Sequence, residues 1–154
     1  TDAYEMIEQI GIISNKESKA KMLISHIKEN FSQLQHSNSN PQTIYLIWQK
    51  PYMTVGGDTF IHSMIEAAGF QNIYANSTRY PEVTIEELKA KNPDLIILSS
   101  EPFPFNQKHI DELQVHLPTT KIVLADGEMF SWYGSRLIKA PAYFATASEQ
   151  IVRP

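Results

Sequence analysis

The chain has 154 residues, 42% of them hydrophobic, and a formal net charge of -4 at pH 7, which predicts one folding unit around one hydrophobic core. It contains no cysteine, no basic cluster, no run of eighteen apolar residues and no signal-peptide pattern. These features argue against disulfides, thiol chemistry, a nucleic-acid partner, an anionic membrane surface and a membrane span, and they leave the compartment open.

Residues 1–36 are predicted to form a helical section. A short helix is expected over residues 2–12. A longer one is expected over 15–35, because apolar residues recur at helical spacing at Ala20, Leu23, Ile24, Ile27, Phe31 and Leu34. Ser14 and Glu17 have the spacing of a capping box at its start. The polar stretch HSNSNPQ ends this section and separates it from an α/β lobe predicted over residues 42–154.

Three continuous apolar runs predict strands that are covered on both faces, as in parallel sheets. They are TIYLIW (43–48), DLIILS (94–99) and KIVLA (121–125), and a short fourth strand is expected within 70–75. Helical patterns cover residues 58–68, 85–91, 107–116 and 134–147, the last with a break at Pro141. This alternation predicts a small doubly wound α/β fold with a mainly parallel sheet flanked by helices.

Ligands of parallel sheets bind outside the carboxyl ends of the strands, so the loops that follow the strands are the candidate site. These loops and the segment NSTRYPE (76–82) are unusually aromatic, which favours a large, flat, partly apolar ligand over side chains that merely fold back on the sheet. The candidate residues are Lys50, Pro51, Tyr52, Tyr80, Glu101, Pro102, Phe103, Asp126, Met129, Trp132 and Tyr133; Phe105 and Phe130 are further aromatic residues of the same loops.

Catalytic and metal motifs are weak by comparison. The five histidines have no metal-ligand spacing, so no metal site is predicted. VGGDT (55–59) matches no nucleotide-binding pattern and is interpreted as a turn with a helix cap at Asp58. Asp126 and Glu101 form a conceivable acid/base pair, but no serine nucleophile or histidine accompanies them. A small hydrolase or transferase using these two acids therefore stays an alternative, and no catalytic residue is assigned.

Glu86 lies in the segment PEVTIEEL (81–88), which predicts a helix start. Thr84 and Glu87 have the spacing of a capping box, so Glu87 has a structural role. Glu86 is left without one, and a favourable interaction with the helix dipole would be enough to explain it.

Several segments together resemble the carboxy-terminal lobe of the ABC-importer substrate-binding proteins for vitamin B12, haem and ferric siderophores. They are WQKPYMTVGGDTFIHSMIEAAGFQNIY (48–74), YPEVTIEELKAKNPDLIILSS (80–100) and DGEMFSWYGSRL (126–137). The start of the chain, TDAYEMIEQIGIISNKESKAKMLISHI, is similar to the helical connection between the two lobes of that family. The resemblance covers residues 1–147 and implies an α/β lobe preceded by a long connecting helix.

The resemblance implies that a corrinoid, haem or ferric siderophore binds between two lobes, without an intrinsic cofactor. Tyr80 matches the position where the vitamin B12 binder has a tryptophan against the corrin; a tyrosine keeps a flat face and is also a possible axial haem ligand. Asp126 and the pair Trp132 and Tyr133 match a cleft loop. Arg136 is expected to pair with an acidic ligand edge or with Asp126, and Glu86 matches an acid that docks on the permease.

The departure from the family is length, because only one lobe is present. The resemblance therefore implies a missing amino-terminal lobe and an exposed inner face that favours self-association. It also implies an ABC permease as the partner and a periplasmic or other extracytoplasmic location, with a lipid anchor as one option. A third alternative is a protein-interaction domain without ligand.

Overall fold

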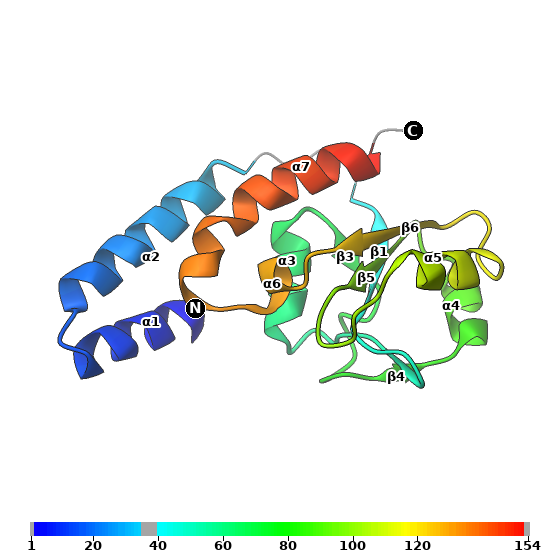
Figure 1. The fold of residues 1–154 in the computed structure, drawn as a ribbon, viewed down its shortest axis with the longest axis horizontal. Helices are drawn as coiled ribbons and strands as arrows, with labels where there is room; N and C mark the ends of the chain where they lie inside the picture. Colours follow the sequence, from blue (N-terminus) through cyan, green and yellow to red (C-terminus); the bar gives the residue numbers. More distant parts are fainter. Residues whose placement is uncertain (1, 35–39, 153–154) are drawn as a thin grey trace.

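A four-stranded parallel sheet forms the centre of the fold (Figure 1). The computed structural model describes residues 2–34 and 40–152. Its sheet has the order β3-β1-β5-β6, with β1 at Gln42–Leu46, β3 at Gln71–Asn72, β5 at Leu95–Ser99 and β6 at Lys121–Ala125. The three predicted strands are confirmed within two residues at each end, and the fourth is only two residues long.

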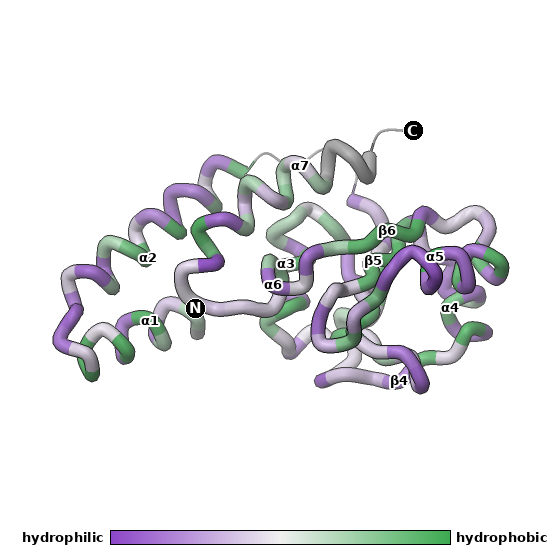
Figure 2. Tube along the Cα trace, viewed as in Figure 1, coloured by the Kyte–Doolittle hydropathy of each residue, from purple (hydrophilic) through white to green (hydrophobic). Residues whose placement is uncertain are grey.

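Helices cover both faces of this sheet. Tyr45 and Ile97 pack toward α3 (Phe60–Ala67), α6 (Glu128–Ser131), the 3-10 helix η1 (Gly134–Ile138) and α7 (Ala140–Val152). Leu46 and Ile96 pack toward α4 (Ile85–Lys91) and α5 (Gln107–Gln114). The predicted doubly wound α/β fold is therefore confirmed. Figure 2 shows the hydrophobic strands inside the body, and no helix of the described ranges has the length and apolar character that crossing a membrane requires.

The amino-terminal section is a helical hairpin that extends away from the sheet (Figure 1). It consists of α1 (Asp2–Ile13) and α2 (Glu17–Ser32), and α2 is fixed to the body because the Asn30 Nδ2 donates to the Ile138 carbonyl at 2.9 Å. The capping box predicted at Ser14 is wrong. Lys16 is the N-cap and gives no side-chain bond, while the Ser14 hydroxyl donates back to the Ile10 carbonyl at 2.6 Å.

Two other boundaries differ from the prediction. Thr59 rather than Asp58 caps α3, accepting the His62 N–H at 3.2 Å. The helix predicted over 134–147 is divided before Pro141, which lies buried in the first turn of α7, where a proline needs no N–H partner. Of the predicted linker, residues 36–39 lie outside the described ranges, as does residue 35 of the predicted longer helix.

A small antiparallel ribbon lies beside the main sheet and was not predicted. It pairs β2 (Tyr52–Met53) with β4 (Glu82–Val83) in the register Tyr52 to Val83. Runs of two residues are too short to show a periodic pattern, so the sequence contained no signal for it.

Gly56 and Gly57 allow a close backbone contact next to this ribbon. The Gly56 N–H donates to the Arg79 carbonyl at 2.8 Å and the Gly57 N–H to the Ser77 carbonyl at 2.9 Å. A Cβ on Gly57 would lie 2.0 Å from the Ala75 carbonyl oxygen. The motif VGGDT is therefore a site of close approach that fixes the segment carrying Tyr80, and not only a turn.

Tyr45 connects β1 to the end of β5 inside the core. Its hydroxyl donates to the Ser99 Oγ at 3.0 Å, and its ring lies 5.0 Å from that of Phe130. Burial raises the pKa of Tyr45 far above its ordinary value, and the bond to Ser99 only partly opposes this.

Replacing Gly57 with alanine should destabilise the fold by about 2 kcal/mol or more, because the new Cβ would overlap a backbone carbonyl that has little room to move. Urea unfolding followed by circular dichroism measures the change. Gly134→Ala is the matched control, since Gly134 has φ of +79° but no atom within 4 Å of its Cβ position. It should cost about 1 kcal/mol from backbone strain alone. If the two variants lose the same free energy of unfolding, the close-contact explanation is wrong.

Tyr45→Phe should change how stability depends on alkaline pH. In the unfolded chain Tyr45 releases its proton near pH 10, whereas the folded chain retains it, so stability falls as pH rises above 10. This group contributes a slope of at most about 1.4 kcal/mol per pH unit. The phenylalanine variant should lose about 1 kcal/mol at pH 8 with the missing hydrogen bond, and it should show a flatter decline from pH 10 to 11. Urea unfolding at each pH measures the free energy of unfolding. If this free energy falls as steeply with pH in Tyr45→Phe as in the parent, the pKa assignment is wrong.

Candidate functional site

The chain diverges at the carboxyl ends of β1 and β5, which are neighbours in the sheet. After β1 it continues to α3 on one face, and after β5 it continues to α5 on the other. Such a switch point is where ligands bind in open α/β sheets. The loops that follow β1, β5 and β6 therefore leave the sheet at the same edge and remain the candidate site.

Trp48 begins the first of these loops and was not predicted as a site residue. It is 40% exposed, and its ring meets that of Phe103 edge to face with centroids 5.6 Å apart. Phe103 also contacts Phe105 and the ring of His109, at 4.7 and 5.2 Å. The sequence placed Trp48 inside the first strand because the apolar run includes it. A tryptophan at the last position of such a run, next to the polar Gln49, was the available signal.

The predicted site residues of the first loop are exposed or half-buried. Lys50 and Pro51 are exposed, while Tyr52 is half-buried and its hydroxyl accepts a bond from the Gln49 Nε2 at 3.0 Å. Tyr80 is 45% exposed on the segment that the two glycines hold.

Trp132 joins the loop after β6 to the loop after β5. Its indole Nε1 donates to the Glu101 Oε2 at 2.8 Å, across 31 residues of sequence. The Arg136 guanidinium lies 5.9 Å from the centroid of the Trp132 ring and forms an ion pair with Glu128. The pairing of Arg136 with Asp126 that was considered from the sequence is therefore wrong within this chain.

Tyr133 is held next to Trp132 by a residue from another element. Its ring stacks on that of Phe60, at the start of α3, with centroids 4.3 Å apart and an angle of 27° between the planes. Trp132 and Tyr133 remain 47% and 43% exposed. Two adjacent rings are thus fixed in orientation while much of their surface faces solvent.

The other predicted residues of these loops are mostly buried. Met129 is only 8% exposed and packs in the core beneath the loop, together with Phe130. Phe105 is also buried, and Pro102 is exposed. The aromatic content of the loops is therefore divided between core packing and exposed surface, which the sequence pattern did not distinguish.

Asp126 begins the loop after β6 and has a structural role. Its Oδ1 accepts the Glu128 N–H at 3.1 Å at the start of α6, and its own N–H donates to the Tyr143 hydroxyl at 2.9 Å. Burial raises the pKa of Tyr143. Glu101 accepts the Trp132 indole N–H, so both acids of the hydrolase or transferase alternative are already used by neighbouring donors.

Serine hydroxyls and Gly127 bring the loops after β5 and β6 into close contact. The Ser99 hydroxyl donates to the Glu101 carbonyl at 2.6 Å, and the Gly127 N–H donates to the Ser100 Oγ at 2.9 Å. A Cβ at Gly127 would lie 2.5 Å from the Ser99 Oγ. Glycine is therefore required for the two loops to approach this closely.

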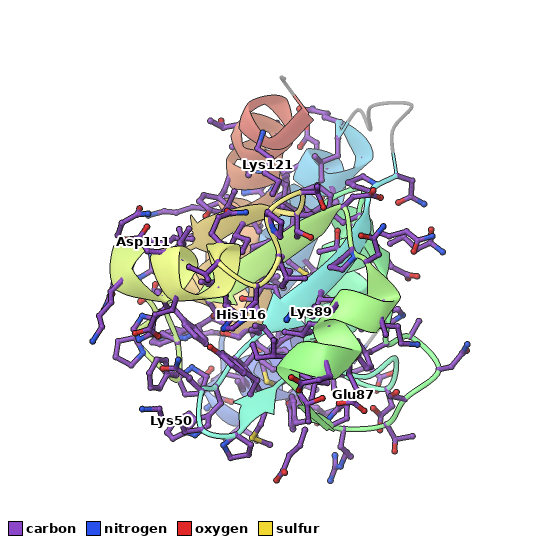
Figure 3. The ribbon with its side chains drawn as sticks, turned by 90° about the vertical axis from the view of Figure 1, so that its right-hand side faces the viewer. Lys50, Glu87, Lys89, Asp111, His116 and Lys121 are labelled. Atoms are coloured by element: carbon purple, nitrogen blue, oxygen red, sulfur yellow. The ribbon has the colours of Figure 1, made fainter. Side chains whose placement is uncertain are left out.

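Glu86 lies at the start of α4. The capping box predicted for that helix is confirmed, since the Thr84 N–H donates to the Glu87 Oε2 at 2.7 Å and the Glu87 N–H donates to the Thr84 Oγ1 at 3.2 Å. Glu86 is exposed in the same turn. Figure 3 shows Glu87 and Lys50 at one end of the molecule and Lys121 at the other, so the start of α4 lies at the end that carries the first loop.

No three histidine, aspartate or glutamate side chains gather as a metal site within residues 2–34 and 40–152. Several polar groups of the candidate site are bonded to one another, as in the pairs of Trp132 with Glu101 and of Arg136 with Glu128. Trp48, Tyr80, Trp132 and Tyr133 supply exposed aromatic surface. This arrangement fits the recognition of a flat, partly apolar molecule.

Relatives of known name share part of this sequence. A vitamin B12-binding protein of Vibrio parahaemolyticus is 26% identical over 102 residues, which cover 64% of this chain and 37% of the relative. An ABC transporter substrate-binding lipoprotein of Bacillus subtilis is 27% identical over 104 residues, covering 63% of this chain and 33% of the relative. The matched part is thus well under half of each relative.

Solved structures share the fold. A possible iron-binding, periplasmic solute-binding protein of Staphylococcus epidermidis superposes with a TM-score of 0.77 at 19% identity, covering 98% of this chain and 62% of that one. The periplasmic vitamin B12-binding protein of Vibrio cholerae gives 0.68 at 16% identity, with coverages of 99% and 63%. A periplasmic haem-binding protein of Pseudomonas aeruginosa gives 0.75 at 15%, with coverages of 98% and 60%. The chain therefore spans less than two thirds of these structures.

These relatives and structural neighbours are substrate-binding proteins and not enzymes. The family model described as periplasmic binding protein matches residues 1–121 of this chain, which is more than half of its length. The chain therefore belongs to the periplasmic binding protein family.

Proposed function

We propose that this chain is part of the solute-binding component of an ABC importer and forms one wall of a site for a metal chelate, namely a corrinoid, haem or a ferric siderophore. The observation that carries the proposal is the exposed aromatic surface at the carboxyl edge of the sheet. Trp48, Trp132 and Tyr133 contribute to it from two of the three loops there. Relatives named for vitamin B12 and structural neighbours named for haem support the choice of ligand class.

The affinity would come mainly from ring stacking and burial of apolar surface. Each half-exposed ring that a ligand covers contributes about 1–2 kcal/mol. Lys50 is exposed at the same edge, and a cation there suits an acidic substituent of the ligand. Tyr80 supplies a further exposed ring, and its hydroxyl is a candidate axial ligand for haem iron.

The second wall would come from an amino-terminal lobe like that of two-lobed family members. The chain matches only 60% to 63% of the structures described above, which supports a longer functional protein. Without that lobe, the exposed rings would favour association between copies of this chain. The site of action would be extracytoplasmic, and a lipid anchor would fit the Bacillus subtilis relative, which is named as a lipoprotein.

Titration of the protein with cyanocobalamin, haemin and a ferric trihydroxamate chelate tests this proposal. At least one of the three should bind saturably, with quenching of tryptophan fluorescence and, for haemin, a shifted absorbance band, because Trp48 and Trp132 lie at the site. Calorimetry then gives the stoichiometry. Failure of all three to bind to a protein that contains both lobes would contradict the proposal and would favour a protein-interaction domain.

Glu86→Ala tests the proposed docking acid. Glu86 is exposed, so its loss should change the free energy of unfolding by less than about 0.5 kcal/mol and leave ligand affinity unchanged. Stimulation of permease ATPase activity in proteoliposomes should fall, because an acid that pairs with basic permease residues is missing.

Glu87→Ala serves as the comparison in the same turn. It should destabilise α4 by about 1 kcal/mol through loss of the capping box. The docking assignment of Glu86 would be wrong if Glu86→Ala weakened ligand binding or left permease stimulation intact.

A further inference from the structure

The most constrained exposed side chain of the candidate site is Trp132. An indole has a single hydrogen-bond donor, and the Nε1 of Trp132 already donates to Glu101 at 2.8 Å. Nevertheless, 47% of the side chain is exposed. What Trp132 can offer a ligand is therefore the carbon surface of its ring, and not a hydrogen bond.

The charged neighbours of Trp132 are themselves paired. The Arg136 guanidinium lies within cation–π distance of the ring, at 5.9 Å from its centroid, and its charge is balanced by Glu128. The carboxylate of Glu101 is engaged by the indole. These four residues, Glu101, Trp132, Arg136 and Glu128, form a network that joins the loop after β5 to α6, its C-cap residue and η1. We call it the indole network.

Fixing a ring before binding reduces the entropy that binding costs. Within the indole network, Glu101 holds the N–H edge of the Trp132 ring and Arg136 lies over the ring. The neighbouring Tyr133 is held by stacking on Phe60, with ring centroids 4.3 Å apart. Two adjacent rings with fixed orientations offer exposed apolar ring surface, which suits a ligand with an extended flat face better than a compact, polar chelate.

We propose, on the basis of the function proposed above, that Glu101 and Arg136 are positioning residues for Trp132 rather than groups that contact the ligand. The surface they prepare selects a ligand with an extended flat face, which means a macrocycle such as a corrin or a porphyrin. A compact ferric trihydroxamate gains little from this surface.

The first arm of the test needs no ligand. In a Trp48→Phe background, Trp132 is the one remaining tryptophan, so its fluorescence anisotropy and its quenching by acrylamide report on the ring alone. Glu101→Ala should lower the anisotropy and raise the quenching constant about twofold, because the released ring, now 47% exposed, becomes mobile. Glu101→Gln should keep values near those of the parent, since an amide oxygen also accepts the indole N–H.

Glu29→Ala is the matched control, because it removes an exposed carboxylate on α2 and should leave both signals unchanged. Circular dichroism checks that each variant is folded, and Glu101→Gln keeps the test decisive if Glu101→Ala does not fold. The positioning role is overturned if Glu101→Ala leaves the mobility of Trp132 unchanged.

The second arm compares ligands. Trp132→Ala should weaken the binding of the macrocycle that binds, haemin or cyanocobalamin, by about tenfold, and Glu101→Ala should weaken it severalfold. Glu101→Gln should bind like the parent, and the ferric trihydroxamate should respond to none of these changes.

If Glu101→Gln and Glu101→Ala lose equal amounts of affinity for the macrocycle, the carboxylate contacts the ligand and the positioning role is overturned. If the Trp132→Ala and Glu101→Ala variants lose as much affinity for the trihydroxamate as for the macrocycle, the proposed selection of a flat ligand is overturned. If no probe binds to a protein that contains both lobes, the proposed function fails, whereas the fluorescence arm still decides whether Glu101 positions Trp132.

Discussion

One buried hydroxyl, that of Ser99, connects the core of the sheet to the loops of the candidate site. Ser99 ends β5, and its Oγ accepts the hydroxyl of Tyr45 from inside the core while donating to the Glu101 carbonyl in the loop. Gly127 approaches the same oxygen so closely that no side chain fits between them. Because buried hydrogen bonds of this kind are costly to break, the loops after β5 and β6 take their shape from the sheet beneath them.

β1 and β5 could be predicted from sequence because a strand covered on both faces is apolar at nearly every position. The same pattern predicts that β6 is covered on both faces, which is wrong, because β6 lies at the edge of the sheet and Leu124 is 44% exposed. The sequence signals for helix starts were less reliable than those for the strands. Thr84 and Glu87 form the expected capping box, whereas Ser14 and Glu17 have the same spacing and do not. The Ser14 hydroxyl bonds instead to a carbonyl of the helix that ends just before it. Spacing alone cannot distinguish a residue that starts one helix from a residue that ends another.

For the candidate site, the sequence indicated which loops take part but not which of their side chains stay exposed. Met129 and Trp132 are three residues apart, and one is in the core while the other is half-exposed. The difference arises from partners that are distant in sequence, such as Glu101 for Trp132 and Phe60 for Tyr133. Such pairings depend on how the chain returns to the same edge of the sheet, and a single sequence contains no direct signal for them.

The ribbon of β2 and β4 ties together two segments that are far apart in the sequence. It joins the loop that carries Lys50 to the backbone that enters α4, through the pairing of Tyr52 with Val83. Val83 is followed directly by Thr84, the N-cap of α4, so this pairing fixes the loop and the first turn of α4 relative to each other. The ribbon therefore connects two surfaces of the protein by a backbone pairing that does not involve the central sheet.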